Sequence, residues 1–220
     1  MDVYNTEEEQ LKAIKEWWSE NGTSIIVGII IGIGGFLGYN WWKDSQTELK
    51  QGASVAYELF TDIDFKANKD EFVSAGEAIK QEYADTAYGA LAALHLAKQF
   101  IQADDLASAQ TQLEWAVKNT EGTEMQPLVS TRLARVLLEQ GKVDAALATV
   151  NAIKVASFEG MKQRLLGDIY AKQGNKVAAQ EAYTKAKEAS ESFAVKNELD
   201  MMIDDLAVAT ETTTTSEPTP

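Results

Sequence analysis

The stretch Asn21-GTSIIVGIIIGIGGFLGYNW-Trp42 decides the architecture of this chain. It contains no charged side chain, and as a helix it is about 33 Å long, enough to cross a hydrocarbon core of about 30 Å. Aromatic side chains stand at both ends, as expected of a helix that meets two lipid–water interfaces. They are Trp17, Trp18, Tyr39, Trp41 and Trp42. The sequence predicts a single transmembrane helix over residues 21–42.

Two other interpretations of this stretch fit less well. A secretory signal peptide has a basic start, a shorter apolar core and a small-residue cleavage site, whereas this chain starts acidic and the core ends in aromatic residues. A buried helix of a soluble fold seldom stays free of charge over such a length.

Glycines within the helix form two pairs at a spacing of four, Gly28 with Gly32 and Gly34 with Gly38. Such pairs let a second membrane helix approach closely, and they are the candidate helix-packing residues of the anchor. Membrane helices also tolerate glycine without any pairing, so the sequence leaves both interpretations open.

Charge and composition limit the partners. Of the net charge of −14, residues 1–20 carry −4 (two Lys, six acidic) and residues 43–220 carry −10 (18 basic, 28 acidic). Because such surfaces repel phosphate backbones, we expect no nucleic acid, and the lipid bilayer must be met through the helix itself. The chain has no cysteine, which excludes disulfides and thiol chemistry. Basic residues flanking the helix are balanced, so charge alone does not set the orientation.

The remaining segments differ in pattern. Residues 1–20 form an acidic segment whose Leu11, Ile14 and Trp18 share one helical face. Helical periodicity continues past Trp42 and, after a polar break at residues 61–69, fills a domain that we place at residues 43–208. The tail, residues 209–220, is rich in Thr and is predicted to be disordered.

An internal repeat organises the domain. Gln140-Gly141 and Gln173-Gly174 lie 33 residues apart between amphipathic segments, and a shift of 37 residues gives a third copy with Asp104 at the turn. Small residues on both helices allow close packing, and larger ones fill the gaps. The repeat-packing candidates are Ala97, Phe100, Ala109, Leu113, Ala134, Leu137, Ala146, Val150, Gly167, Tyr170, Ala179 and Tyr183.

The pattern resembles the tetratricopeptide repeat, a helical hairpin of about 34 residues, although the Trp and the terminal Pro typical of it are absent. We therefore predict an all-α chain: one N-terminal transmembrane helix followed by a tetratricopeptide-like α-solenoid of helical hairpins. A generic helical bundle with a chance register is the alternative. A last helix around residues 193–206 is expected to cap the stack.

No residue pattern predicts catalysis. His95 is the only histidine and has no companion for a triad or a metal site, and no phosphate-binding glycine loop is present. We therefore expect no enzyme, no cofactor and no metal, and interpret the chain as a membrane-tethered interaction module.

The order of these parts resembles the YfgM-like ancillary subunits of the bacterial SecYEG translocon. The resemblance rests on the segments Lys12-Ala-Ile-Lys15, Trp17-Trp18, Glu20-Asn-Gly22, the glycine-rich helix, Trp41-Trp42, Tyr88-Gly-Ala-Leu91, Leu96-Ala-Lys-Gln-Phe100 and Leu133-Ala-Arg-Val136.

The resemblance implies a single-pass protein of the bacterial inner membrane with a cytoplasmic N-terminus and a periplasmic repeat domain. It further implies association with SecYEG and with a membrane-anchored periplasmic chaperone of the prolyl-isomerase type, and assistance to newly exported client proteins. The alternative function is a tetratricopeptide scaffold for another inner-membrane complex, such as cell-envelope or division machinery.

Overall fold

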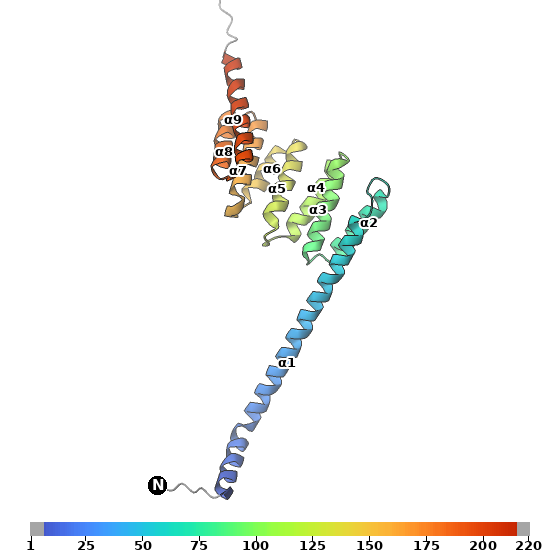
Figure 1. Ribbon diagram of the computed structural model, residues 1–220, viewed down its shortest axis with the longest axis vertical. Coiled ribbons are helices and arrows are strands. Elements are labelled where there is room, and N and C mark those ends of the chain that lie inside the picture. The colour runs from blue at the N-terminus through green and yellow to red at the C-terminus, as the bar shows by residue number, and fades with distance from the viewer. Residues whose placement is uncertain (1–6, 215–220) are drawn as a thin grey trace, which may run out of the picture. The chain divides into compact units, whose positions relative to one another are not determined.

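The computed structural model describes residues 7–214, and within that range every regular element is helical (Figure 1). The prediction of an all-α chain is confirmed. The elements are α1 (Glu7–Thr61), α2 (Lys69–Glu82), α3 (Ala87–Gln102), α4 (Leu106–Asn119), α5 (Gln126–Glu139), α6 (Val143–Asn151), the short 3-10 turn η1 (Ala156–Phe158), α7 (Glu159–Lys172), α8 (Lys176–Glu188) and α9 (Phe193–Thr214).

The chain forms two compact units, residues 1–52 and residues 53–220. The described part of the first unit is the long N-terminal portion of α1, which includes the apolar stretch. Among the described residues, α1 is the one helix long and apolar enough to cross a membrane. Residues 7–20 and 43–52 belong to α1 as well, and no proline interrupts them. Compact packing starts at the fully buried Ala53, ten residues after the domain start expected from the sequence.

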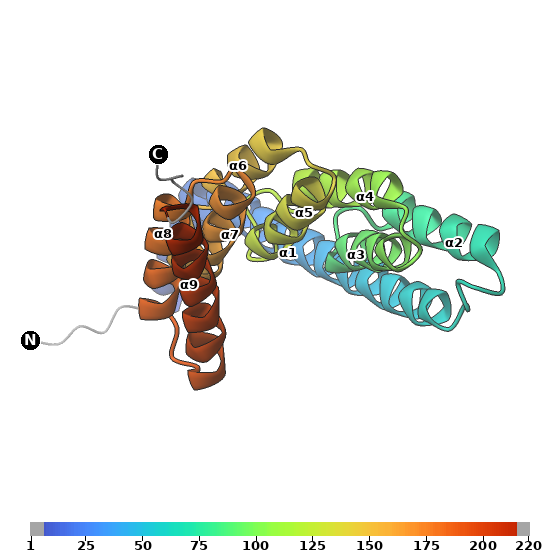
Figure 2. The same cartoon turned by 90° about the horizontal axis from the view of Figure 1, so that it is seen from above.

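The second unit is a series of helical hairpins. Successive helices α3 to α8 pair as α3–α4, α5–α6 and α7–α8, and Figure 2 shows these pairs following one another within the unit. Each hairpin turns at a residue with positive φ: Asp104 (59°), Gly141 (74°) and Gly174 (76°). The three residues occupy the same position in the three repeats. The tetratricopeptide-like hairpins and their register are therefore as predicted.

Capping side chains and a proline explain where several helices start. The Asp105 carboxylate accepts a hydrogen bond from the Ser108 backbone N–H at 3.0 Å, and the Asn175 side chain accepts one from the Ala178 N–H at 3.2 Å, so each caps a second helix of a hairpin. Pro127 lies in the first turn of α5, where its missing N–H costs nothing.

The core consists of two groups of buried side chains. The larger runs from Phe60 at the end of α1 to Ala182 in α8, and the smaller joins Ala179, Tyr183 and Ala186 of α8 to Leu199 of α9. Helix α9 thus covers the last hairpin, as a capping helix does. It continues to Thr214, so residues 209–214 of the tail that we expected to be disordered are helical; no proline follows until Pro218. Residues 215–220 lie outside the described range.

Candidate interaction site

The apolar part of α1 exposes large hydrophobic side chains that a soluble fold would bury. Ile31 is 68% exposed and Phe36 is 64% exposed. The aromatic residues at the two ends are exposed as well, and Trp41 at 75% is the most exposed of them. Only a lipid environment or a partner helix can cover this surface without a large hydrophobic cost, so the first unit is itself a contact surface.

The glycines of this helix share one face. With 100° between successive residues, Gly28, Gly32, Gly34 and Gly38 fall within an arc of about 160°, and Gly35 falls within the same arc. Val27 and Ile31 also fall within this arc, whereas Ile29, Ile33 and Leu37 lie on the opposite side. A Cβ added at any of these five glycines meets no atom of the described chain within 4 Å. The surface at these glycines, which we call the glycine face, therefore leaves room at the glycine positions for another helix to approach.

The repeat-packing candidates of the second unit lie where hairpins meet. Eleven of the twelve are buried and Tyr170 is partly buried. The structure brings eight of them into the larger core group: Ala97, Phe100, Ala109, Leu113, Ala134, Leu137, Ala146 and Val150. Ala179 and Tyr183 lie in the smaller group, against which Tyr170 also packs. These residues build the scaffold of the repeat domain.

Gly167 shows why the repeat needs small residues. A Cβ at this position would lie 2.3 Å from the Tyr183 ring, so α7 and α8 approach in a way that only glycine permits. The Tyr183 hydroxyl donates a hydrogen bond of 2.8 Å to the Asp168 carboxylate. Burial raises the pKa of Asp168, and the hydrogen bond from Tyr183 and the charges of Arg164 and Arg135 oppose that rise.

His95 is held among aromatic rings. Its ring centroid lies 5.3 Å from that of Phe60, 5.4 Å from that of Phe72 and 6.5 Å from that of Tyr57. Burial, with a smaller contribution from the Lys98 charge, lowers the pKa of His95 below its ordinary value. The described residues contain no group of three His, Asp or Glu side chains placed to hold a metal ion.

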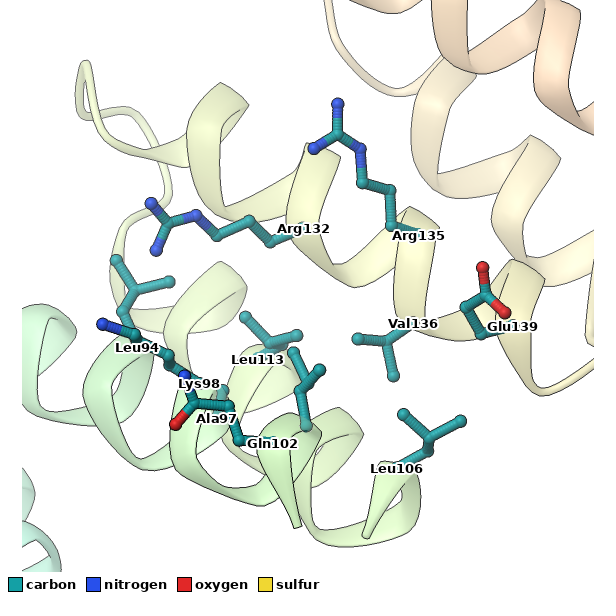
Figure 3. Close-up of a pocket in the computed structure, with 11 residues that line it drawn as sticks. Leu94, Ala97, Lys98, Gln102, Leu106, Leu113, Arg132, Arg135, Val136 and Glu139 are labelled. Carbon is teal, nitrogen blue, oxygen red and sulfur yellow. The ribbon is translucent and has the colours of Figure 1, made fainter. Parts of the chain in front are cut away.

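A hollow of about 600 Å³ lies between α3, α4 and α5 (Figure 3). We call it the α3–α5 groove. The volume is that of a typical ligand pocket. Its lining consists of Leu94, Ala97, Lys98, Ile101, Gln102, Leu106, Leu113, Arg132, Arg135, Val136 and Glu139. Its floor is apolar and its rim is charged, which makes it a candidate binding surface of the second unit.

The charged residues of this groove were not predicted from the sequence, although the repeat register shows that some of them occupy equivalent positions. Lys98, Arg135 and Asp168 each follow the small residue of a first helix, so they occupy one position in three successive repeats. That position faces the groove at Lys98 and Arg135, whereas Asp168 is largely withdrawn into contact with Tyr183.

Comparison with known proteins identifies the family of this chain. The model of a tetratricopeptide repeat-like domain family matches residues 15–208. A protein of Escherichia coli named ancillary SecYEG translocon subunit is 30% identical over 208 residues, which is 94% of this chain and the full length of that relative. The protein of the same name from Haemophilus influenzae is 35% identical over 193 residues, or 84% of this chain and 91% of the relative. The chain belongs to the family of ancillary SecYEG translocon subunits.

A more distant member, from Neisseria gonorrhoeae, is 28% identical over 94% of this chain and its own full length. The family assignment thus covers the membrane helix together with the repeat domain, and it confirms the resemblance drawn from the sequence. Ancillary translocon subunits with a tetratricopeptide repeat-like domain are a non-enzymatic kind of family. The one candidate membrane helix at the N-terminus fits a protein of the inner membrane.

Proposed function

We propose that this chain is an accessory subunit of the SecYEG translocon that assists newly exported proteins. In this proposal α1 crosses the bacterial inner membrane once, with the N-terminus in the cytoplasm and the helical repeats in the periplasm. The repeats act with a membrane-anchored periplasmic chaperone of the prolyl-isomerase type. One observation carries the proposal: the relatives that match over the membrane helix and the repeats alike are all named ancillary SecYEG translocon subunits.

The architecture supports this role on physical grounds. A helical-repeat domain offers an extended surface for protein segments. A single membrane helix keeps that surface near the membrane, which raises its effective concentration at any membrane partner without strong contacts. The acidic repeat domain gains nothing from anionic lipid, so the helix rather than surface charge provides the attachment.

The glycine face of α1 is the proposed contact with another membrane helix. Replacing Gly28, Gly32, Gly34 and Gly38 by Leu adds bulk to this face, and the open space around each position means that the described chain itself is not disturbed. We expect the variant to insert normally and to recover less SecYEG on purification in mild detergent. Placing Leu instead at Ile26, Ile29 and Ile33 on the opposite face is the control. Equal recovery from both variants would remove the glycine face from the interface.

Orientation can be tested directly because the chain has no cysteine. A single cysteine replacing Lys15 or Lys66, both exposed, becomes the one labelling site. We expect a membrane-impermeant maleimide added to cells with a permeabilised outer membrane to label the Lys66→Cys variant and not the Lys15→Cys variant. The reverse pattern would place the repeats in the cytoplasm.

Site-specific photocrosslinking in cells tests the function. A photoreactive residue replaces the exposed Asp44 just after the membrane stretch, Gln102 at the α3–α5 groove, or Thr111 on α4. Crosslinks to translocon subunits, exported chains and the periplasmic chaperone are the expected products. Stable crosslinks to a cell-envelope or division complex, with none to the translocon, would instead establish the scaffold function.

A further inference from the structure

The α3–α5 groove has the features of a selective binding site, and an inference about it rests on the proposed function. Its floor is formed by the buried Leu94, Ala97, Leu113 and Val136, and Ile101, which is 43% exposed, extends that apolar surface to the opening. An exposed isoleucine beside an open hollow leaves apolar surface in water, and a bulky apolar side chain that entered the hollow would cover it.

The rim of the groove concentrates positive charge on a domain whose net charge is −10. Lys98 comes from α3, and Arg132 and Arg135 come from α5. In Figure 3 the Arg132 side chain extends toward the end of the hollow where Leu94 and Lys98 lie, and Glu139 stands at the other end. The groove therefore has a cationic end and an end with a carboxylate.

Two of these cations have no anionic partner within the described chain. Neither Lys98 nor Arg132 makes an ion pair or a side-chain hydrogen bond with the side chains that the structure describes, those of residues 9–206. One neighbour of Lys98 on its own helix is His95, whose protonation the Lys98 charge disfavours. Arg135 differs, because its charge acts on Asp168 of α7. Like charges at one end of an apolar hollow repel each other, and an anion placed between them relieves that repulsion.

We propose that the α3–α5 groove binds a segment of a partner polypeptide that carries a bulky apolar side chain next to acidic side chains. The apolar side chain occupies the hollow between Leu113 and Val136. The carboxylates lie against Lys98 and Arg132. Glu139 at the far end repels acidic residues there, so the segment binds in one direction with its acidic part at the Lys98 end. Basic segments are rejected at the cationic rim.

The test uses the full chain in detergent micelles and fluorescence anisotropy of labelled peptides. The probe is the peptide Ser-Asp-Glu-Leu-Phe-Gly-Ser. One comparison peptide has Lys at both acidic positions and another has Ala at Leu and Phe. We expect binding of the probe alone, weakening as salt is raised because part of the attraction is between charges.

Variants locate the binding site. Lys98→Glu and Arg132→Glu should each weaken binding by about tenfold, and Ile101→Asp should do the same through the apolar floor. Lys66→Glu makes the same charge change at an exposed loop position outside the groove and should leave the affinity unchanged. Circular dichroism of each variant checks that the helices are retained.

Equal binding of all three peptides, or equal weakening by Lys66→Glu, would overturn this inference. Recovery of SecYEG with each variant is measured on separate samples from cells. Loss of peptide binding with SecYEG recovery retained supports the groove as a client site distinct from the translocon contact. SecYEG absent from the wild-type sample overturns the proposed function, whatever the peptides show.

Discussion

Gly167→Ala probes the closest helix–helix contact of the repeat domain. The added Cβ would lie 2.3 Å from Cδ1 and Cε1 of Tyr183, where ordinary contacts begin near 3.4 Å, so the ring has to move by about 1 Å. Tyr183 is only 5% exposed, and its hydroxyl is held by Asp168 at 2.8 Å. The ring therefore cannot move without loss elsewhere.

The magnitude follows from three contributions. Overpacking costs about 1–3 kcal/mol, and weakening the hydrogen bond from Tyr183 to a carboxylate costs about 1.5–3 kcal/mol. The higher helix propensity of alanine relative to glycine offsets about 1 kcal/mol of this loss. We expect the free energy of unfolding to fall by about 3 kcal/mol. Because repeats depend on their neighbours, the loss should be concentrated in α7, α8 and α9.

The assay is urea unfolding of the full chain in mild detergent, followed by far-UV circular dichroism, with hydrogen exchange to locate the loss. Gly160→Ala in the first turn of α7 is the control, because its added Cβ has its nearest neighbour at 3.3 Å; it should stay within about 1 kcal/mol of wild type. Combining Gly167→Ala with Tyr183→Leu removes the ring, so the double variant should be more stable than the sum of the single changes predicts. A Gly167→Ala chain as stable as wild type would refute this account of the contact.

Three further predictions concern stability in the same assay. The pKa of His95 is lowered mainly by burial, so below pH 6.5 the folded chain binds fewer protons at this residue than the unfolded chain. The free energy of unfolding should therefore fall as the pH drops from about 7 to about 5.5, and it should fall less in the His95→Gln variant. Parallel pH curves for the two proteins would contradict this. Lys80 is 6% exposed and pairs with Glu77 at 2.8 Å. Glu77→Ala should therefore lower the free energy of unfolding by about 1–3 kcal/mol, and Glu77→Gln should lower it by less. Equal losses in the two variants would show that the Glu77 charge is unimportant. Asp104 has a φ of 59° and Gly141 a φ of 74°, a backbone conformation that favours glycine. Asp104→Gly should therefore stabilise the chain by about 0.5 kcal/mol, and Gly141→Ala should destabilise it by about 1 kcal/mol. Changes of the opposite sign would contradict the turn geometry that these two positions share.

Local signals in the sequence were sufficient for the architecture. The charge-free stretch with aromatic ends predicts a membrane helix because its composition alone sets its preference for lipid. The hairpins and their turns follow from apolar periodicity and from Gly141 and Gly174, since a residue with positive φ is a local requirement of the turn. The buried repeat positions follow from the same register, because each repeat packs chiefly on its neighbours.

Tertiary structure decided what the surface can bind. Lys98 and Arg132 belong to different repeats, and nothing in their local sequences shows that they share one end of a hollow. Their proximity depends on how α5 packs against α3 and α4. The placement of α9 against the last hairpin likewise depends on tertiary packing, since Leu199 is buried against α8. Periodicity is a property of each segment and can be read along the chain, whereas a binding groove arises only from the packing of several segments.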